Sequence, residues 1–349
     1  MPIPDQLSSI DPATYAPYRD PRDYILSWTD EIWIDMGLGR LDEHYGKDIK
    51  VHTAYGETYD FDHVIMNSVQ KMSAFPNGGG GSGEDVVWEE RGSKGFISSH
   101  RVFKTGTHTG YWTYGPPTGK DWVSRTIAHC TVQDGKIVEE WLVRDEYAVL
   151  QSLGLDPNRI AWDLALASPV TGEVVNVSKS AAFAGTYENP TLEGISGKRP
   201  DRFAAECEMI TAMYDDVWNK RLFNKVNDYC SPKVVSHSVR MRRAQGIQGY
   251  QQQVIDLLAA FPDGRIELRD LVVNESSDLG LRVAAVWTLH ATYSGVPIYG
   301  QPTRTPVTIM GITHFEIRDG KILREWRLYD EIAVLTQIMQ ARQANGEEL

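Results

Sequence analysis

Cysteine and long apolar runs are both scarce in this chain of 349 residues. The three cysteines, Cys130, Cys207 and Cys230, are scattered and odd in number, so free thiols in a reducing compartment are the simplest account of them. No run of about 18 apolar residues occurs, so we expect no transmembrane helix. The opening residues 1–6 lack the basic and then apolar pattern of a signal peptide. We therefore expect a cytoplasmic protein.

Positive charge is also in short supply. Lysine and arginine number 35 against 47 aspartate and glutamate residues, so the formal net charge is −12. A surface for nucleic acid or for an anionic membrane requires a basic footprint, which this balance does not favour. We expect a small molecule as the partner, with no nucleic acid and no membrane.

Several motifs of known chemistry are missing. The sequence contains no Gly-x-Ser-x-Gly nucleophile elbow. The glycine-rich residues 78–83 predict a flexible loop and not a phosphate site, because no Gly-Lys-Ser/Thr follows. Neither His-x-His nor Glu-x-x-His spacing occurs, so we expect no metal. A metal site built from His52, His100, His108 and His129 is the weaker alternative.

One stretch occurs twice, and the rest of the chain is organised around it. Residues 129–137 read His-Cys-Thr-Val-Gln-Asp-Gly-Lys-Ile, and residues 314–322 read His-Phe-Glu-Ile-Arg-Asp-Gly-Lys-Ile, an offset of 185 from 129 to 314. Glu-Trp, Asp-Glu and Ala-Val-Leu follow both copies at the same offset. Asp-Gly between alternating apolar residues is the strongest short hairpin signal. Each copy therefore predicts a β-hairpin that leads into a helix.

The duplication extends over most of the chain and predicts two tandem domains. We place them at 1–155, with an irregular N-terminal arm, and at 203–349. The segment 156–202 is rich in Pro, Gly and Ser and predicts a linker that wraps one domain or covers a pocket. The two sheets are expected to pack together as an internal pseudo-dimer, and further homo-oligomerisation is left open.

Each half follows an α+β pattern of helices and then antiparallel strands. Apolar spacing predicts a helix over about 24–45 in the first half, and Phe-Pro turns end the helices predicted at about 62–75 and 247–261. The expected strands are 86–91, 95–107, 122–133 and 136–144 in the first half, and 266–273, 281–294, 306–317 and 321–329 in the second.

The carboxylates at the strand-to-helix junctions, Asp145 and Asp330, are the first candidate site residues. Residues two apart on a strand share a face, so Asp145 is expected beside Trp141, and Asp330 beside Trp326. A carboxylate among apolar side chains has a raised pKa, which suits a general base near neutral pH. The alternative is a helix N-cap, for which Asp is a preferred residue.

Histidines recur at equivalent positions of both copies. His129 and His314 lie on the partner strand of each hairpin, where an imidazole bonded to the Asp would form an acid–base pair; the alternative is a structural strand His. Cys130 is expected on the opposite face from His129, so a Cys–His pair is not predicted. The candidate substrate-binding residues are His52, Arg101, His108, Trp141, His237 and Trp326, although Arg101 is equally suited to pair with an acidic residue.

The string from Arg101 to Gly110, with Pro116–Lys120, Asp134–Trp141 and Asp145, resembles the SnoaL-like polyketide cyclase (ester cyclase) family of the nuclear-transport-factor-2-like superfamily. The resemblance covers about 24–155 and, more weakly, 205–340. It implies two tandem cone-shaped domains, each with helices packed in a curved antiparallel sheet around a deep apolar cavity. It also implies acid–base chemistry without metal or organic cofactor.

The family's catalytic Asp matches Asp145 and, by repeat, Asp330, and its His matches His129 and His314. The second copy departs from the pattern, because Val286, Ala291 and Tyr293 replace Arg101, Gly106 and His108. This departure raises the alternative that one half is catalytic and the other structural.

The leading hypothesis is a cofactor-independent enzyme acting on a small to medium apolar carbonyl compound, as an aldol-type cyclase, hydratase or dehydratase, isomerase or hydrolase. Asp145 would be the base, and His129 or His52 the proton donor. The rival hypothesis is a non-catalytic module of the same fold that binds a hydrophobic ligand or assembles with a partner.

Overall fold

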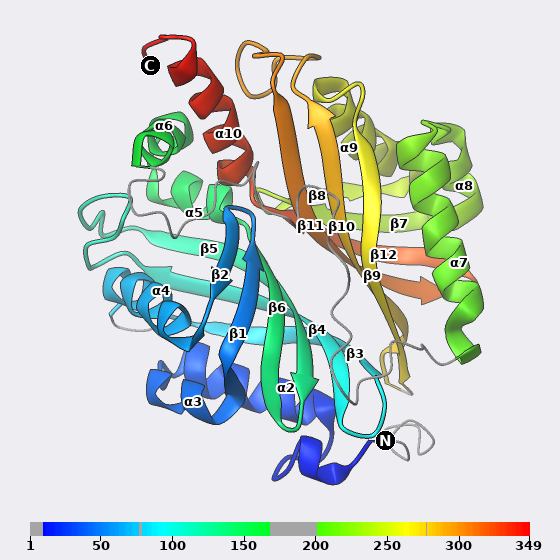
Figure 1. The fold of residues 1–349 in the computed structure, drawn as a ribbon. Helices are drawn as coiled ribbons and strands as arrows, with labels where there is room; N and C mark the ends of the chain where they lie inside the picture. Colours follow the sequence, from blue (N-terminus) through cyan, green and yellow to red (C-terminus); the bar gives the residue numbers. More distant parts are fainter. Residues whose placement is uncertain (1–9, 77–78, 168–200, 277) are drawn as a thin grey trace.

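The computed structural model describes residues 10–76, 79–167, 201–276 and 278–349. Its core is two six-stranded sheets, one in each half of the chain, and helices cover one face of each sheet (Figure 1). This arrangement confirms the α+β class and the two tandem domains of the predicted fold.

The first sheet has the order β2-β1-β6-β5-β4-β3. All neighbouring strands are antiparallel except β1 and β6, which run parallel, so the sheet is mixed and not purely antiparallel. Its strands are β1 (Tyr45–Thr53), β2 (Gly56–Tyr59), β3 (Gly81–Glu90), β4 (Gly95–Thr107), β5 (Asp121–Gln133) and β6 (Lys136–Arg144). The start of β3 places residues 81–83 of the glycine-rich stretch in a strand, where a loop was predicted, and residues 77–78 lie outside the described part.

The second sheet repeats this topology in the order β8-β7-β12-β11-β10-β9, again with one parallel pair, β7 and β12. Its strands are β7 (Cys230–Ser238), β8 (Arg242–Gln245), β9 (Arg265–Ser276), β10 (Gly280–Thr292), β11 (Pro306–Arg318) and β12 (Lys321–Tyr329).

Both predicted hairpins are confirmed. Strands β5 and β6 meet at Asp134-Gly135, and β11 and β12 meet at Asp319-Gly320. All four turn residues have positive φ, 48° and 77° in the first turn and 50° and 68° in the second. Two consecutive positive φ angles define the tight turn whose twist matches that of the flanking strands, and Asp-Gly tolerates it well.

The N-terminal helix predicted over 24–45 is interrupted. Helix α2 (Pro21–Thr29) passes into a π-helical turn, η2 (Asp30–Ile34), and the chain then turns at Met36, where φ is 62°. The short helices η3 (Leu38–Arg40) and α3 (Leu41–His44) complete this region, and η1 (Pro12–Thr14) precedes it. The second half repeats the pattern with η5 (Asp201–Phe203), α7 (Ala204–Met213), the π-helical η6 (Tyr214–Asn219), η7 (Phe223–Lys225) and α8 (Val226–Tyr229).

The remaining helices follow the prediction more closely. Helix α4 (Phe61–Ala74) and helix α9 (Gly246–Ala260) lie against the sheets, and α5 (Glu146–Leu153) and α10 (Glu331–Ala344) follow the hairpins. The segment predicted as a linker contains a helix, α6 (Pro157–Ala167), which packs against α10 of the other half. Residues 168–200 of that segment lie outside the described part. No helix in the described part is long and apolar enough to cross a membrane.

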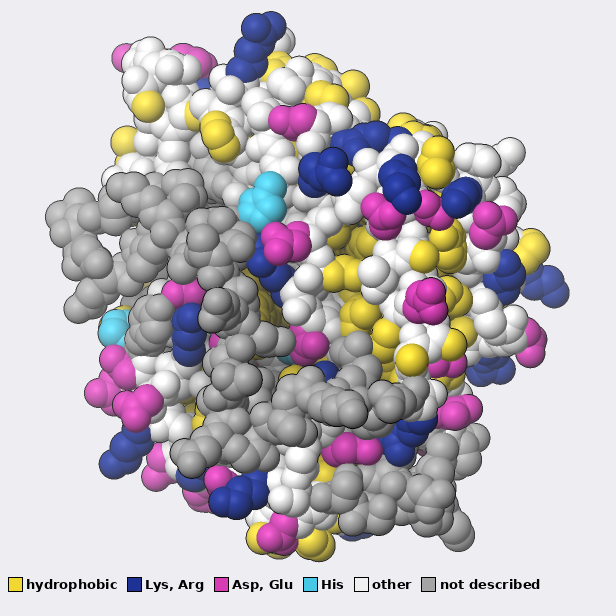
Figure 2. Space-filling view, turned by 45° about the vertical axis from the view of Figure 1, so that its right-hand side comes forward, with side chains coloured by type: hydrophobic (Ala, Val, Ile, Leu, Met, Phe, Trp, Pro, Cys, Tyr) yellow, Lys and Arg dark blue, Asp and Glu magenta, His cyan; other side chains and the backbone are white. Residues whose placement is uncertain are grey.

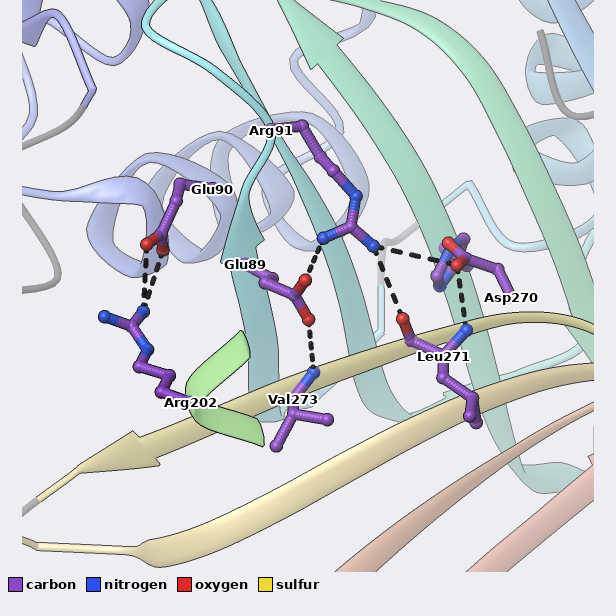
Figure 3. A network of polar contacts seen from close by, with 8 residues as sticks. Glu89, Glu90, Arg91, Arg202, Asp270, Leu271 and Val273 are labelled. Atoms are coloured by element: carbon purple, nitrogen blue, oxygen red, sulfur yellow. Dashed lines mark hydrogen bonds and ion pairs between the residues drawn. The ribbon is translucent and has the colours of Figure 1, made fainter. Parts of the chain in front are cut away.

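The two sheets pack against each other through the faces that their helices leave uncovered. Val87 and Ile97 of the first sheet form one apolar cluster with Val272 and Ala284 of the second. A polar network also joins the two sheets (Figure 3). In it, Glu89 accepts a hydrogen bond from the Val273 backbone amide at 2.9 Å and pairs with Arg91, and Arg91 reaches the Leu271 carbonyl oxygen at 3.4 Å. Both faces of each sheet are therefore covered by protein.

Acidic and basic side chains are interspersed on the face of the molecule drawn in Figure 2. Several Lys and Arg side chains lie close together toward the upper right of this view, with acidic side chains next to them.

Candidate active site

A cavity of about 470 Å³ lies in the first domain, between the helix-covered face of its sheet and helices α2 and α4. On β6 every second residue from Glu140 to Arg144 lines it, and most lining residues of β4 and β5 also alternate, so the cavity takes one face of the sheet. The polar side chains of this lining are Thr29, Tyr45, Thr53, Tyr55, Glu57, Thr58, Asn67, Ser68, Gln70, Lys71, His100, Lys104, Thr105, Thr113, Tyr114, Thr126, Glu140, Arg144 and Glu146.

Glu140 is a carboxylate of this lining whose pKa is strongly raised. It lies on β6, is 6% exposed, and accepts a hydrogen bond from the Tyr45 hydroxyl at 3.4 Å. Burial raises its pKa to about 7, against the lowering effects of the Arg144 charge and of the Tyr45 hydrogen bond. A carboxyl group with a pKa near the working pH is suited to take up and release a proton.

Two basic side chains of β4 also line the cavity. Burial lowers the pKa of His100 to about 4, so its imidazole is neutral at pH 7, and its Nδ1 atom has no hydrogen-bond partner within the described residues. Lys104 donates to the Trp33 carbonyl oxygen at 3.1 Å and lies over the Trp33 indole. Burial, with the charges of Lys71 and Arg144, lowers the pKa of Lys104 to about 7.

The remaining walls of the cavity consist of aromatic side chains and one ion pair. Phe75 packs against Trp112 and Trp122, with ring centroids 5.1 and 4.7 Å away, and Trp112 packs against Tyr114 at 4.2 Å. Lys71 of α4 forms an ion pair of 2.9 Å with Glu146. A planar apolar molecule would find aromatic surface in this cavity together with a few ionisable groups.

The structure places the predicted site residues elsewhere, on the opposite face of the strands or behind the cavity walls. All ten lie in the described part, and none of them lines the cavity. They are His52, Arg101, His108, His129, Trp141, Asp145, His237, His314, Trp326 and Asp330.

Asp145 caps helix α5 and bridges the two halves. Its Oδ1 accepts hydrogen bonds from the backbone amides of Ala148, at 3.3 Å, and Arg240, at 2.9 Å, and its Oδ2 accepts one from the amide of Met241, at 3.0 Å. Burial raises its pKa to about 6, and these hydrogen bonds oppose the rise. The alternative of a helix N-cap is therefore what the geometry shows, and both carboxylate oxygens are engaged.

Asp330 caps helix α10 in the same way, accepting from the amides of Ile332 at 2.9 Å and Ala333 at 3.3 Å. Burial, with the negative charge of Glu146, raises its pKa to about 8. Its charge also acts on Tyr55 and Tyr114 of the first domain, which places it close to the cavity wall.

The predicted pairing of each Asp with the His of its own hairpin does not form. His129 instead contacts Asp270 of the second sheet, with 3.0 Å between its Nε2 and the carboxylate. His314 contacts Ser99 at 2.8 Å and Arg101 at 3.3 Å, both on the first sheet. Each His thus holds the two sheets together, because it projects from the face that packs against the other domain.

The predicted substrate-binding residues lie in similar surroundings. His52 and His237 stack on Trp141 and Trp326, with ring centroids 4.5 and 5.4 Å apart. Arg101 pairs with Glu84 at 2.7 Å, the alternative role considered for it, and its guanidinium lies 3.8 Å from the centre of the Trp326 ring. His108 lies behind the aromatic wall and hydrogen-bonds Thr118.

The predicted residues of β6 and the cavity lie on opposite faces of the strand, because one step along a strand reverses every side chain. Asp145 was predicted to share a face with Trp141 at the site, whereas Glu140, Leu142 and Arg144 line the cavity. The residues missed for this reason are His100, Lys104, Glu140 and Arg144, with Lys71 and Glu146 nearby.

The corresponding space of the second domain is filled. Trp287 stands at the position of Val102, and its indole donates a hydrogen bond to Thr313 at 2.9 Å. Gly311 stands opposite it at the position of Thr126, and a Cβ there would lie 2.1 Å from the indole. Arg327, which pairs with Glu325 at 2.7 Å, lies over Trp218 and fills more of the space.

No group of three or more His, Cys, Asp or Glu side chains among the described residues is arranged to hold a metal ion. The polar groups gathered in the cavity are suited to proton transfer and to hydrogen bonding of an oxygen-bearing ligand.

Comparisons with known proteins place the chain in a family. The model of the SnoaL-like polyketide cyclase family matches residues 25–153 and 208–338. No curated protein matches. Three similar solved structures are described as polyketide cyclases, and each is matched nearly in full by about two fifths of this chain. The protein from Jannaschia sp. CCS1 is 20% identical, with 41% of this chain and 98% of that chain covered and a TM-score of 0.36. The protein from Acidithiobacillus ferrooxidans is 23% identical (coverage 39% and 96%, TM-score 0.34), and the one from Agrobacterium tumefaciens is 21% identical (coverage 38% and 96%, TM-score 0.31). The chain belongs to the SnoaL-like polyketide cyclase family, of which it carries two tandem copies.

Proposed function

We propose that the first domain is a cofactor-independent acid–base enzyme that acts on a planar, largely apolar carbonyl compound, and that the second domain is its structural partner. The observation that carries the proposal is Glu140, a buried carboxyl group with a pKa of about 7 in the wall of an aromatic cavity. The family supports a cyclase or a related activity, and the finer reaction, whether cyclisation, hydration, isomerisation or hydrolysis, is part of the proposal.

In this mechanism Glu140 removes a proton from the carbon next to the substrate carbonyl. The Tyr45 hydroxyl orients the carboxylate. The neutral imidazole of His100 would donate a hydrogen bond to the developing enolate oxygen, because its buried Nδ1 has no partner in the described part of the chain. The enolate carbon then attacks a second carbonyl, whose oxygen takes the proton that Glu140 removed, or the enolate carbon itself takes that proton back at a new position. Either route returns Glu140 to its ionised form.

The proposal can be tested without knowledge of the natural substrate. The probe is 2-tetralone in D₂O, and NMR measures enzyme-dependent exchange of its α-protons. We expect exchange by the wild type to rise with pH through about 7, because Glu140 must be ionised to act as a base. Glu140→Gln should lower the exchange rate by about 100-fold or more, since general bases contribute on this scale.

Asp145→Asn is the matched control, because it removes a different carboxylate that also has a raised pKa. We expect this variant to keep its exchange activity as long as it remains folded. Unchanged exchange in Glu140→Gln would contradict the role of Glu140 as the base. Loss of exchange in a folded Asp145→Asn would indicate that Asp145 is the base. Binding of 2-tetralone without exchange by the wild type would favour the non-catalytic binding module.

A further inference from the structure

Two basic side chains of the cavity form no ion pair within the described part of the chain, although the charge of Arg144 acts on Glu140 and Asp330 from a distance. Arg144 lines the cavity from the end of β6 and forms neither a hydrogen bond nor an ion pair there. Lys104 lines it from β4 and donates only to the Trp33 carbonyl oxygen. Both side chains are half-buried in the cavity wall, so a counter-charge from a ligand would stabilise them.

The acidic side chains of the same cavity do not supply this counter-charge. Glu146 is paired with Lys71 at 2.9 Å, and Glu57 contacts both Lys50 and His52 at 3.2 Å. Burial raises the pKa of Glu140 to about 7, so this carboxyl group is only partly ionised at neutral pH. Burial likewise lowers the pKa of Lys104 to about 7, so this amine is only partly charged at neutral pH. Arg144 is therefore the fully charged cation of the lining that forms no ion pair among the described residues.

The strand register separates these cations from the acid–base groups. Glu140 and Arg144 lie four residues apart on one face of β6, and His100 and Lys104 lie four apart on one face of β4. Four residues of a strand span about 13 Å. Arg144 pairs with Thr126 in the register, and Thr126 pairs with Val102, so Arg144 and Lys104 lie in neighbouring rows at the same end.

The second domain supports a ligand-related role for both cations. Tyr329 and Leu289 stand at the positions of Arg144 and Lys104, and Ala285 stands at that of His100. Tyr329 and Leu289 are buried in the core that fills that domain. The charged end is thus present only in the half that has the cavity.

We propose that the substrate is two-ended: a planar carbonyl compound that carries an anionic substituent, such as a carboxylate, bound by Arg144 and Lys104, while its reacting carbon lies beside Glu140. Only the placement of the reacting carbon beside Glu140 rests on the proposed function; the binding of the anionic group by Arg144 and Lys104 does not depend on it. Arg144 and Lys104 would act as specificity-determining residues, because they favour charged ligands over neutral ligands of the same shape.

The test is a binding measurement with a matched pair of probes, 2-naphthoate and 2-naphthamide, titrated calorimetrically at pH 7. The probes have nearly the same shape and differ in charge. We expect the wild type to bind the naphthoate about 10- to 100-fold more tightly, as is typical for a hydrogen bond to a charged group. Arg144→Gln and Lys104→Gln should each remove much of this preference, and Arg144→Lys should keep part of it.

Arg265→Gln is the control, since it removes the same charge from an exposed position of the second domain and should keep the full preference. Thermal unfolding of each variant checks that it is folded. Equal binding of the two probes by the wild type, no binding of naphthoate at millimolar concentration, or an unchanged preference in the folded Arg144→Gln, Lys104→Gln double variant would overturn the proposal. Glu140→Gln should keep the preference, so failure of the catalytic proposal and failure of this one are distinguishable.

Discussion

A single step along strand β6 separates side chains with different tasks. Glu140 and Arg144 face the cavity, whereas Trp141 packs toward the other domain and Asp145 binds backbone amides of that domain. Glu140 and Asp145 both have raised pKa values, mainly because they are buried. A raised pKa therefore does not by itself identify a catalytic group, and the direction of the side chain decides its role.

The two junction carboxylates are expected to differ in their contribution to stability. Asp145, with a pKa of about 6, is mostly ionised at pH 7 and accepts three backbone hydrogen bonds, two of them from the other domain. Asp145→Asn replaces one accepting oxygen by an amide group and should lower the free energy of unfolding by about 2 kcal/mol. Asp330, with a pKa of about 8, is mostly protonated at pH 7.

A protonated Asp resembles Asn, which is also a good N-cap, so Asp330→Asn should cost less than about 1 kcal/mol. Urea unfolding of both variants at pH 7 checks the difference. Equal losses would show that the bonds from Asp145 to the second domain contribute little.

At the scale of elements, the same hairpin and helices enclose a cavity in one half and a filled core in the other. The difference depends on a few positions of the sheet face, chiefly Trp287 with Gly311 in place of Val102 with Thr126. The indole of Trp287 lies where a Cβ at position 311 would be. Glycine at this position makes room for the aromatic ring, and the ring in turn takes the place of a ligand.

Gly311→Ala should lower the free energy of unfolding by about 2 kcal/mol or more, because its Cβ would overlap the Trp287 indole at 2.1 Å. Gly39→Ala is the control, since a Cβ there meets no atom within 4 Å. In the double variant Gly311→Ala, Trp287→Val the overlap is absent. Its loss of unfolding free energy should therefore be smaller than the sum of the losses of the two single variants, by at least about 1 kcal/mol. Strict additivity would contradict the proposed overlap.

At the scale of the whole molecule, the two sheets share an interface that contains buried charge. Arg282 of β10 pairs with Asp85 of β3, and the two side chains are 5% and 11% exposed. Arg282 also donates to Asn274 at 2.7 Å. The polar network of Figure 3 and the contact of His129 with Asp270 belong to the same interface. A buried charged group without its partner is strongly destabilising, so the two sheets are most stable in the alignment that brings these partners together.

Arg282→Ala should destabilise the protein by about 3–5 kcal/mol, because it leaves the Asp85 carboxylate buried without its partner. Arg318→Ala removes an arginine of the same sheet whose side chain is 60% exposed and pairs with Glu316 at 2.9 Å, and it should cost less than about 1 kcal/mol. Thermal and urea unfolding of both variants measure the difference. Similar losses would indicate that Asp85 finds water or another donor when Arg282 is removed.

The sequence by itself determined the duplication, the α+β class and the two hairpins, because these features depend on local signals. Asp134-Gly135 and Asp319-Gly320 adopt the turn that their residue types favour, wherever the rest of the chain lies. The resemblance around Arg101–Asp145 likewise identified the family, which the match to residues 25–153 and 208–338 shows.

Only the tertiary structure decided which face of each strand serves the cavity. Strand β4 is buried at eight consecutive positions, Gly95–Val102, so alternation of apolar and polar residues gives no signal there. Helices cover one face of the first sheet and the second sheet covers the other. Histidine, arginine and tryptophan side chains occur on both faces. The direction of a side chain then depends on contacts with residues more than a hundred positions away, such as His129 with Asp270, which no local pattern encodes.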